Sequence, residues 1–279
     1  MRSSSNPAFR NLPRGAAEYG PNVGFNQPQG GVPGYGPPQT SAGAGDRPMT
    51  VDDVVIKTAL SLGTALVTGV LTAIWAISQI PMSASGKILG IPGAVIGALV
   101  GSMIVGLVIS LVIIFKKMPS GPLTLAYSAV EGVFLGAISG LFEALYPGIA
   151  LQAIVGTAGV FIAMLVVYKT GAVKVTPKLT KWIIGAVVGV AIMMLVNLVT
   201  SLFFGFNPLR DGGPIAIIFS LVVIGVAAFS FLLDFDQADR MIREGTPSKW
   251  SWYVAFGLMT TLVWLYLEIL RLLSYFQSD

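Results

Sequence analysis

Seven long apolar segments separated by short polar stretches dominate the pattern along this chain. They cover residues 54–80, 88–115, 123–145, 149–168, 182–206, 214–233 and 250–276. A helix needs roughly 20 apolar residues to cross the hydrocarbon core of a bilayer, which is about 30 Å thick. The segments are continuously apolar rather than alternating, which favours helices over the strands of a membrane barrel. The pattern therefore predicts an all-α protein, a bundle of seven transmembrane helices.

The amino-acid composition limits the kinds of reaction and binding site that the chain can form. Charged residues make up 11% of the 279 residues, whereas a typical soluble domain contains about 25%. The chain has no cysteine and no histidine, which excludes thiol nucleophiles, disulfides, imidazole bases and the usual zinc sites. No enzyme motif is present. We therefore expect neither catalysis nor a cofactor, which leaves transport, ion leak and scaffolding as the candidate functions.

The basic residues are distributed unevenly between the two ends of the predicted helices. If each segment crosses once, the side that holds the N-terminus carries 14 of the 17 Lys and Arg residues. The other side carries only Lys87, Arg210 and Arg271. The positive-inside rule then predicts a cytoplasmic N-terminus and an outside C-terminus in the cell (inner or plasma) membrane. Because topology explains the basic residues, we expect the lipid bilayer and no nucleic acid as a partner.

The first 47 residues differ in kind from the rest. They are rich in Gly, Pro, Gln and Asn, and such composition predicts a disordered cytoplasmic tail ahead of a transmembrane domain at 48–279. Docking of a membrane-protein partner through Tyr19 and Tyr35 is the alternative to a passive solvated extension, which the composition favours. After the tail, Thr50 is predicted to cap the first helix.

Glycines recur at four-residue spacing in the second and third segments. They are Gly93, Gly97 and Gly101, then Gly132, Gly136 and Gly140. This spacing places each set on one helix face, where small residues allow two backbones to approach closely. We therefore expect both faces to pack against neighbouring helices.

Glu131 and Glu268 lie within the apolar segments, and Asp234 lies at the end of the sixth. Glu143, next to residues 146–148, is expected at the outer surface. A charge near the bilayer centre costs roughly 3 kcal/mol on insertion scales, so it usually faces the protein interior. At 1.5 Å per residue, Glu131 lies about 12 Å into its segment, and Asp234 about 15 Å from the end of a helix extended to residue 244. These two acids are therefore expected to share a layer. Glu268 lies about 27 Å along the last segment, with Arg271 one turn later as an ion-pair partner.

The end of the sixth segment carries a different set of charges. Asp236 can pair with Arg240, and Asp239 with Arg243, at the i,i+4 spacing of neighbours on a helix surface. We expect a solvated helical extension held by these pairs.

Two interpretations of the interior acids remain open. Carboxylates close together in a low dielectric cannot both ionise readily, and a cation such as Ca²⁺ removes that penalty. A proton- or cation-sensing layer, with Asp234 as a Ca²⁺ ligand, is one interpretation. In the other, each acid simply bonds a hydroxyl or amide. Candidate partners for such bonds are Ser128, Asn197, Thr260 and Thr261.

Three motifs around these acids resemble a known family. They are PLTLAYSAVEG at 122–132, FLLDFDQ at 231–237 and LYLE at 265–268. The chain is similar over about residues 50–275 to the Bax inhibitor-1/YccA (TMBIM) family, most closely to bacterial members with an extended N-terminal tail. The resemblance implies a bundle in which the seventh helix is central and the other six surround it.

The resemblance also implies a pH-sensitive Ca²⁺ leak controlled by two acids, which by motif are Asp234 and Glu268 here. The chain departs from the family pattern because Glu replaces Asp in the seventh helix and no Arg lies in 88–115. An alternative alignment on 267–273 places Thr261 at the second acid position.

The leading hypothesis is therefore a cation-conducting or cation-sensing membrane protein whose path is lined by Glu131, Asp234 and Glu268. The accessory residues are Asp236, Arg271 and Thr261. The rival hypothesis is a non-conducting scaffold, or a regulator of stress or proteolysis, that binds other membrane proteins. The sequence leaves the oligomeric state open.

Overall fold

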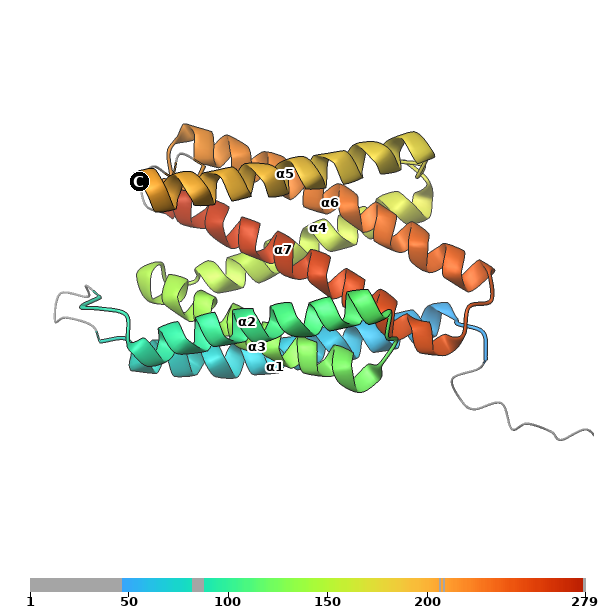
Figure 1. The fold of residues 1–279 in the computed structure, drawn as a ribbon, viewed down its shortest axis with the longest axis horizontal. Helices are drawn as coiled ribbons and strands as arrows, with labels where there is room; N and C mark the ends of the chain where they lie inside the picture. Colours follow the sequence, from blue (N-terminus) through green and yellow to red (C-terminus); the bar gives the residue numbers. More distant parts are fainter. Residues whose placement is uncertain (1–46, 82–87, 206, 208, 278–279) are drawn as a thin grey trace, which may run out of the picture. The chain divides into compact units, whose positions relative to one another are not determined.

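A computed structural model of the chain describes residues 47–81, 88–205, 207 and 209–277 (Figure 1). The elements are α1 (Val51–Gln79), α2 (Gly93–Lys116), α3 (Gly121–Leu145), α4 (Ile149–Thr170), α5 (Pro177–Phe204), α6 (Pro214–Arg243), the 3₁₀ turn η2 (Ser248–Trp250) and α7 (Ser251–Gln277). All seven α-helices are long and apolar enough to cross a membrane. The predicted all-α bundle of seven helices is confirmed. The expectations for the tail, including Tyr19 and Tyr35, fall on residues outside the described ranges.

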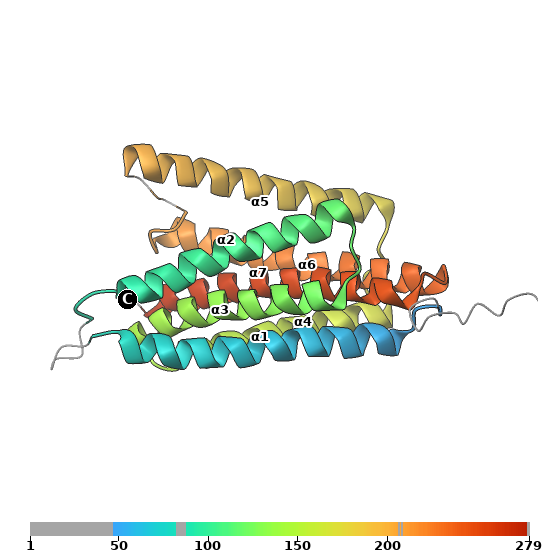
Figure 2. The same cartoon turned by 60° about the horizontal axis from the view of Figure 1, so that its bottom comes forward.

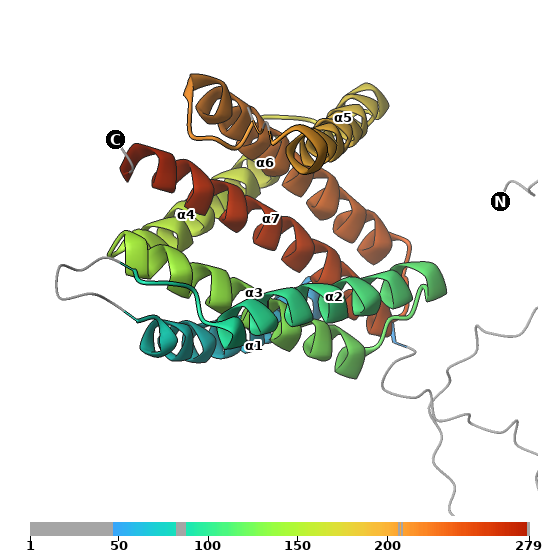
Figure 3. The same ribbon diagram turned by 60° about the vertical axis from the view of Figure 1, so that its left-hand side comes forward.

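Helix α7 forms the centre of the bundle. It packs against α1, α3, α4 and α6, and it runs between the α1–α2–α3 group and the α5–α6 pair in Figures 1 and 3. In its most apolar stretch 72% of the residues are buried, against 17% to 39% in the other six helices. Met259, Leu265 and Leu270 are among its almost fully buried side chains. The central seventh helix that the resemblance implied is thus present.

The glycine face of α3 packs against α1. A Cβ atom added at Gly136 would lie 2.7 Å from the Thr72 Cβ, and one at Gly140 would lie 2.9 Å from the Ala76 Cβ. Real Cβ atoms essentially never approach other atoms this closely. The predicted close packing through Gly132, Gly136 and Gly140 is therefore confirmed.

The matching prediction for α2 is wrong. An added Cβ at Gly93, Gly97 or Gly101 would meet no described atom within 4 Å. The buried face of α2 is formed instead by Val95, Ser102, Gly106 and Ile113. Because α2 packs on α3 through that other face, Gly93, Gly97 and Gly101 point outward.

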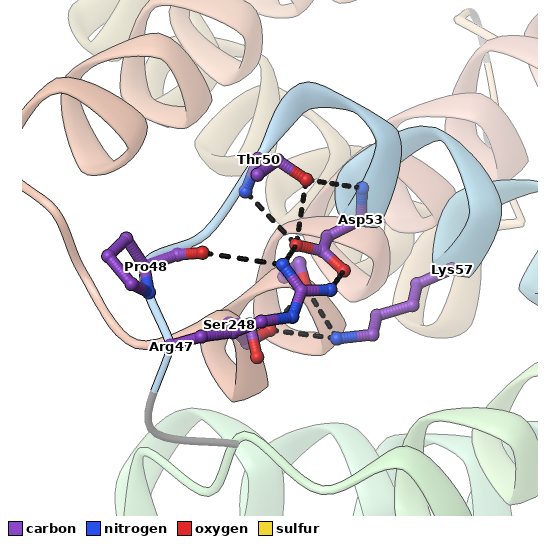
Figure 4. Close-up of polar contacts among 7 residues, drawn as sticks. Arg47, Pro48, Thr50, Asp53, Lys57 and Ser248 are labelled. Atoms are coloured by element: carbon purple, nitrogen blue, oxygen red, sulfur yellow. Dashed lines mark hydrogen bonds and ion pairs between the residues drawn. The ribbon is translucent and has the colours of Figure 1, made fainter. Parts of the chain in front are cut away.

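The chain just before α1 is tied to the connection between α6 and α7 (Figure 4). Met49 N donates to Thr246 O at 2.8 Å, and Ser248 N donates to Arg47 O at 2.8 Å. The predicted cap is confirmed, because the Thr50 side chain accepts from Asp53 N in a capping box. These bonds hold the start of α1 beside the start of α7.

Candidate functional site

Asp234 lies at the interface between α6 and α7. Its Oδ2 atom accepts a hydrogen bond from the Thr261 hydroxyl at 2.7 Å. Both residues are partly buried. The hydroxyl interpretation of the interior acids therefore describes Asp234 correctly. It also places Thr261, and not Glu268, level with Asp234, in agreement with the alternative alignment.

Glu131 lies on the α3 side of α7. It interacts with the Tyr127 hydroxyl one turn earlier on α3, and that hydroxyl lies 3.4 Å from Thr260 Oγ1 on α7. The Glu131 carboxylate also faces α2, since a Cβ added at Gly106 would lie 3.0 Å from its Oε1 atom. Gly106 thus provides the space that this carboxylate occupies.

Tyr127 and Asp234 reach consecutive residues of α7, Thr260 and Thr261, and Glu131 lies one turn after Tyr127 on α3. We call Tyr127, Glu131, Asp234, Thr260 and Thr261 the central acid layer. Thr260 is exposed although α7 is otherwise the most buried helix. The acids thus approach α7 from different helices, Glu131 from α3 and Asp234 from α6; that they share a layer stays a prediction.

The other suggested partners serve different purposes. Ser128 donates to Thr124 O at 2.9 Å within α3. Asn197 bonds the α5–α6 connection, where its Oδ1 atom accepts from Leu209 N at 3.2 Å. Sequence reasoning missed Tyr127 as a neighbour of Glu131. Its i,i+4 spacing before Glu131 is the signal that could have indicated it.

Glu268 lies two turns beyond Thr261, about 10 Å farther along α7. Its side chain is 2% exposed, and its Oε1 atom pairs with Arg271 at 2.8 Å and with Arg210 at 3.2 Å. The predicted Glu268–Arg271 pair is confirmed. Glu268 and Asp234 therefore do not form a diacid pair in this structure, since each bonds other partners at a different level.

Arg210 comes from the connection between α5 and α6, and the sequence did not indicate its role. Its guanidinium lies 5.9 Å from the centre of the Phe219 ring on α6 and 3.3 Å from Met194 Sδ on α5. We call Glu268, Arg210 and Arg271 the Glu268 cluster. It links α5, α6 and α7 at one end of the bundle. A carboxylate held by two guanidiniums is already neutralised, which makes it a poor ligand for a metal cation.

The end of α6 matches its prediction. Asp236 pairs with Arg240, and Asp239 pairs with Arg243, both at i,i+4 spacing on the helix surface. Asp236 is thus engaged at the end of α6 and is separate from the central acid layer.

A resident metal ion does not fit these residues. Across the described ranges, no group of three or more Asp, Glu, His or Cys side chains converges. Ca²⁺ takes six to eight oxygen ligands, whereas Asp234 has one hydroxyl beside it.

Comparison with known proteins agrees with this architecture. The family model described as Bax inhibitor 1 like matches residues 6–278 of the chain. No match was found among curated proteins. The seven apolar helices and the matched family identify an integral, multi-pass membrane protein. The match covers nearly the whole chain, which therefore belongs to the Bax inhibitor 1-like family.

Proposed function

We propose that this protein is a proton-sensitive cation leak, with Ca²⁺ as the expected ion, and that the central acid layer controls it. The observation that supports the proposal is that Asp234 bonds Thr261 on α7, while Tyr127, the neighbour of Glu131, lies beside the preceding residue Thr260. Ionisable groups are costly at membrane depth and usually mark an ion or proton pathway.

Protonation would act through the packing of α3 and α6 on α7. Ionised Asp234 and Glu131 need water or a cation nearby, so they favour a hydrated, cation-accessible arrangement around the exposed Thr260. Protonated acids are neutral and can be satisfied by the Thr261 and Tyr127 hydroxyls alone, which favours a closed bundle. We assign Glu268 to holding the other end of α7 closed with its two arginines.

The test is Ca²⁺ flux in liposomes that contain the purified protein. Flux should be greater at about pH 8 than at about pH 6, because the ionised acids attract the cation. Asp234→Asn should give low flux that no longer depends on pH. The matched control is Asp52→Asn, an exposed position in the first turn of α1, which should behave as the native chain does. Flux no higher than in empty liposomes would refute the proposal.

The predicted orientation belongs to the same proposal. Because the chain lacks cysteine, one cysteine placed at exposed Glu244 or Asp211 gives an unambiguous label. An impermeant thiol reagent should label Asp211→Cys in intact cells and Glu244→Cys only after permeabilisation. The reverse pattern would place the N-terminus outside.

A scaffold for other membrane proteins is the second candidate. The outward glycine face of α2 favours it, because such a face allows another helix to approach closely. Gly97→Leu should then weaken co-purification of partner proteins without changing Ca²⁺ flux. If the tail binds the partner, deletion of residues 1–45 should likewise weaken co-purification without changing Ca²⁺ flux. Loss of flux in either variant would count against a separate binding role.

A further inference from the structure

Helix α5 presents most of its surface to the outside of the bundle. It packs mainly on α6 and lies at the edge in Figure 2. Only Ile183, Val190 and Asn197 are buried along its length. In a membrane, the remaining apolar surface of α5 faces lipid.

Four lysines lie near the start of α5, at the end of α4, in the connection and in the first turns of α5 itself. Lys169, Lys174, Lys178 and Lys181 are all exposed, and the sequence contains no Asp or Glu between 144 and 210. None of the ion pairs in the described ranges includes these lysines. Within the described ranges, no acidic side chain neutralises them.

Two of these lysines border a shallow hollow on α5. It has a volume of about 470 Å³ and is lined by Lys178, Lys181, Trp182, Gly185 and Ala186. We call these residues the lysine hollow. Trp182 is 70% exposed, and a Cβ at Gly185 would meet no described atom within 4 Å. Along α5, the lining of the hollow therefore changes from two lysines to the Trp182 ring and then to small apolar residues.

We propose that the lysine hollow binds an anionic phospholipid. Lys178 and Lys181 contact the phosphate, the Trp182 ring lies beside the glycerol region, and the first part of an acyl chain covers Gly185 and Ala186. Charge complementarity selects an anionic headgroup, since basic residues next to a membrane helix attract such lipids. Tryptophan is also enriched at the membrane–water interface, at the level of the lipid headgroups. The competing explanation is that the lysines only orient the chain, in which case their total charge matters and their position does not.

The experiment follows quenching of Trp182 fluorescence by brominated lipids in nanodiscs that hold the full-length protein. The Trp182 signal is the difference between the native chain and Trp182→Phe. Brominated phosphatidylglycerol and phosphatidylcholine are the anionic and zwitterionic probes. If each of the two lysines strengthens binding of the anionic lipid about fivefold, half-quenching should need about 30-fold less of the anionic probe than of the zwitterionic probe. Equal quenching by the two probes would overturn the proposal.

A matched pair of variants separates position from charge. Lys178→Gln/Lys181→Gln should remove the selectivity, whereas Lys169→Gln/Lys174→Gln changes the same net charge outside the hollow and should retain most of it. An equal loss in both variants would show that total charge alone attracts the lipid and would overturn the proposal.

Two further measurements test the proposal even if thermal unfolding shows that a lysine variant folds poorly. Gly185→Leu fills the hollow without changing charge and should reduce quenching by the anionic probe at least fivefold. Excess inorganic phosphate should not relieve that quenching. Relief by phosphate would indicate a site for a free anion instead of a lipid. These quenching experiments do not measure ion flux, so their outcome tests lipid binding independently of the proposed leak.

Discussion

Replacement of Gly136 by alanine tests the close packing of α1 on α3. The added methyl group would clash with the Gly69 carbonyl oxygen and lie 2.7 Å from the Thr72 Cβ. Ordinary van der Waals contact begins at 3.4 Å, so α1 must move away by about 0.7 Å at Thr72 and farther at Gly69. The backbone of Gly69 cannot rotate out of the way as a flexible side chain would.

The expected cost combines two opposing effects. Overpacking of a well-packed interface costs about 3 kcal/mol when backbone must shift. Alanine recovers up to about 1 kcal/mol through its higher helix propensity. The net loss is therefore about 2 kcal/mol. For a chain of this size that corresponds to a decrease in Tm of about 4–8 °C.

Gly97→Ala is the matched control. It makes the same change on α2, where an added Cβ meets no described atom within 4 Å. It should leave the Tm unchanged or raise it slightly through helix propensity. Thermal unfolding of both variants in the same detergent measures the difference. If Gly136→Ala proved as stable as Gly97→Ala, the proposed contact between α1 and α3 would be wrong.

Three other variants test separate parts of the structure. Gly106→Ala should displace the Glu131 carboxylate and reduce Ca²⁺ flux several-fold in liposomes, while lowering stability by less than about 1 kcal/mol; unchanged flux would argue against a role for Glu131. Arg210→Gln should cost about 2 kcal/mol in thermal unfolding because buried Glu268 loses a charged partner, and Glu268→Gln in the same chain should recover most of that loss. Asp53→Ala should open the capping box and cost about 1 kcal/mol in thermal unfolding, whereas Asp52→Ala should not; an unchanged Tm in Asp53→Ala would contradict this contact.

The helices could be predicted because each depends mainly on its own sequence. The apolar segment at 250–276 corresponds closely to α7, Ser251–Gln277. The polar extension of α6 followed from i,i+4 charges that lie on one helix. The start of α5 was placed five residues late, because Thr176 caps the helix at Leu179 N and Pro177 begins it. Hydropathy cannot detect that first turn, which contains lysine.

The contacts of the interior acids were harder to predict because their partners lie on other elements. The alternative alignment indicated that Thr261 corresponds to the partner position of Asp234, but only the packed bundle brings Arg210 to Glu268. The glycine faces of α2 and α3 have the same spacing, yet only that of α3 is packed. Which face of a helix is covered depends on all its neighbours, and a local motif cannot specify this.

The central position of α7 has a consequence for biosynthesis. Helix α7, which has 27 residues, is the one against which α1, α3, α4 and α6 pack, and it follows all four of them in the sequence. Because a chain is made from its N-terminus, those four helices enter the membrane before their shared partner exists. Packing of these helices on α7 must therefore wait until α7 has been made. A product that stops before residue 251 would be inserted but lack a core, and would be a target for degradation by membrane proteases.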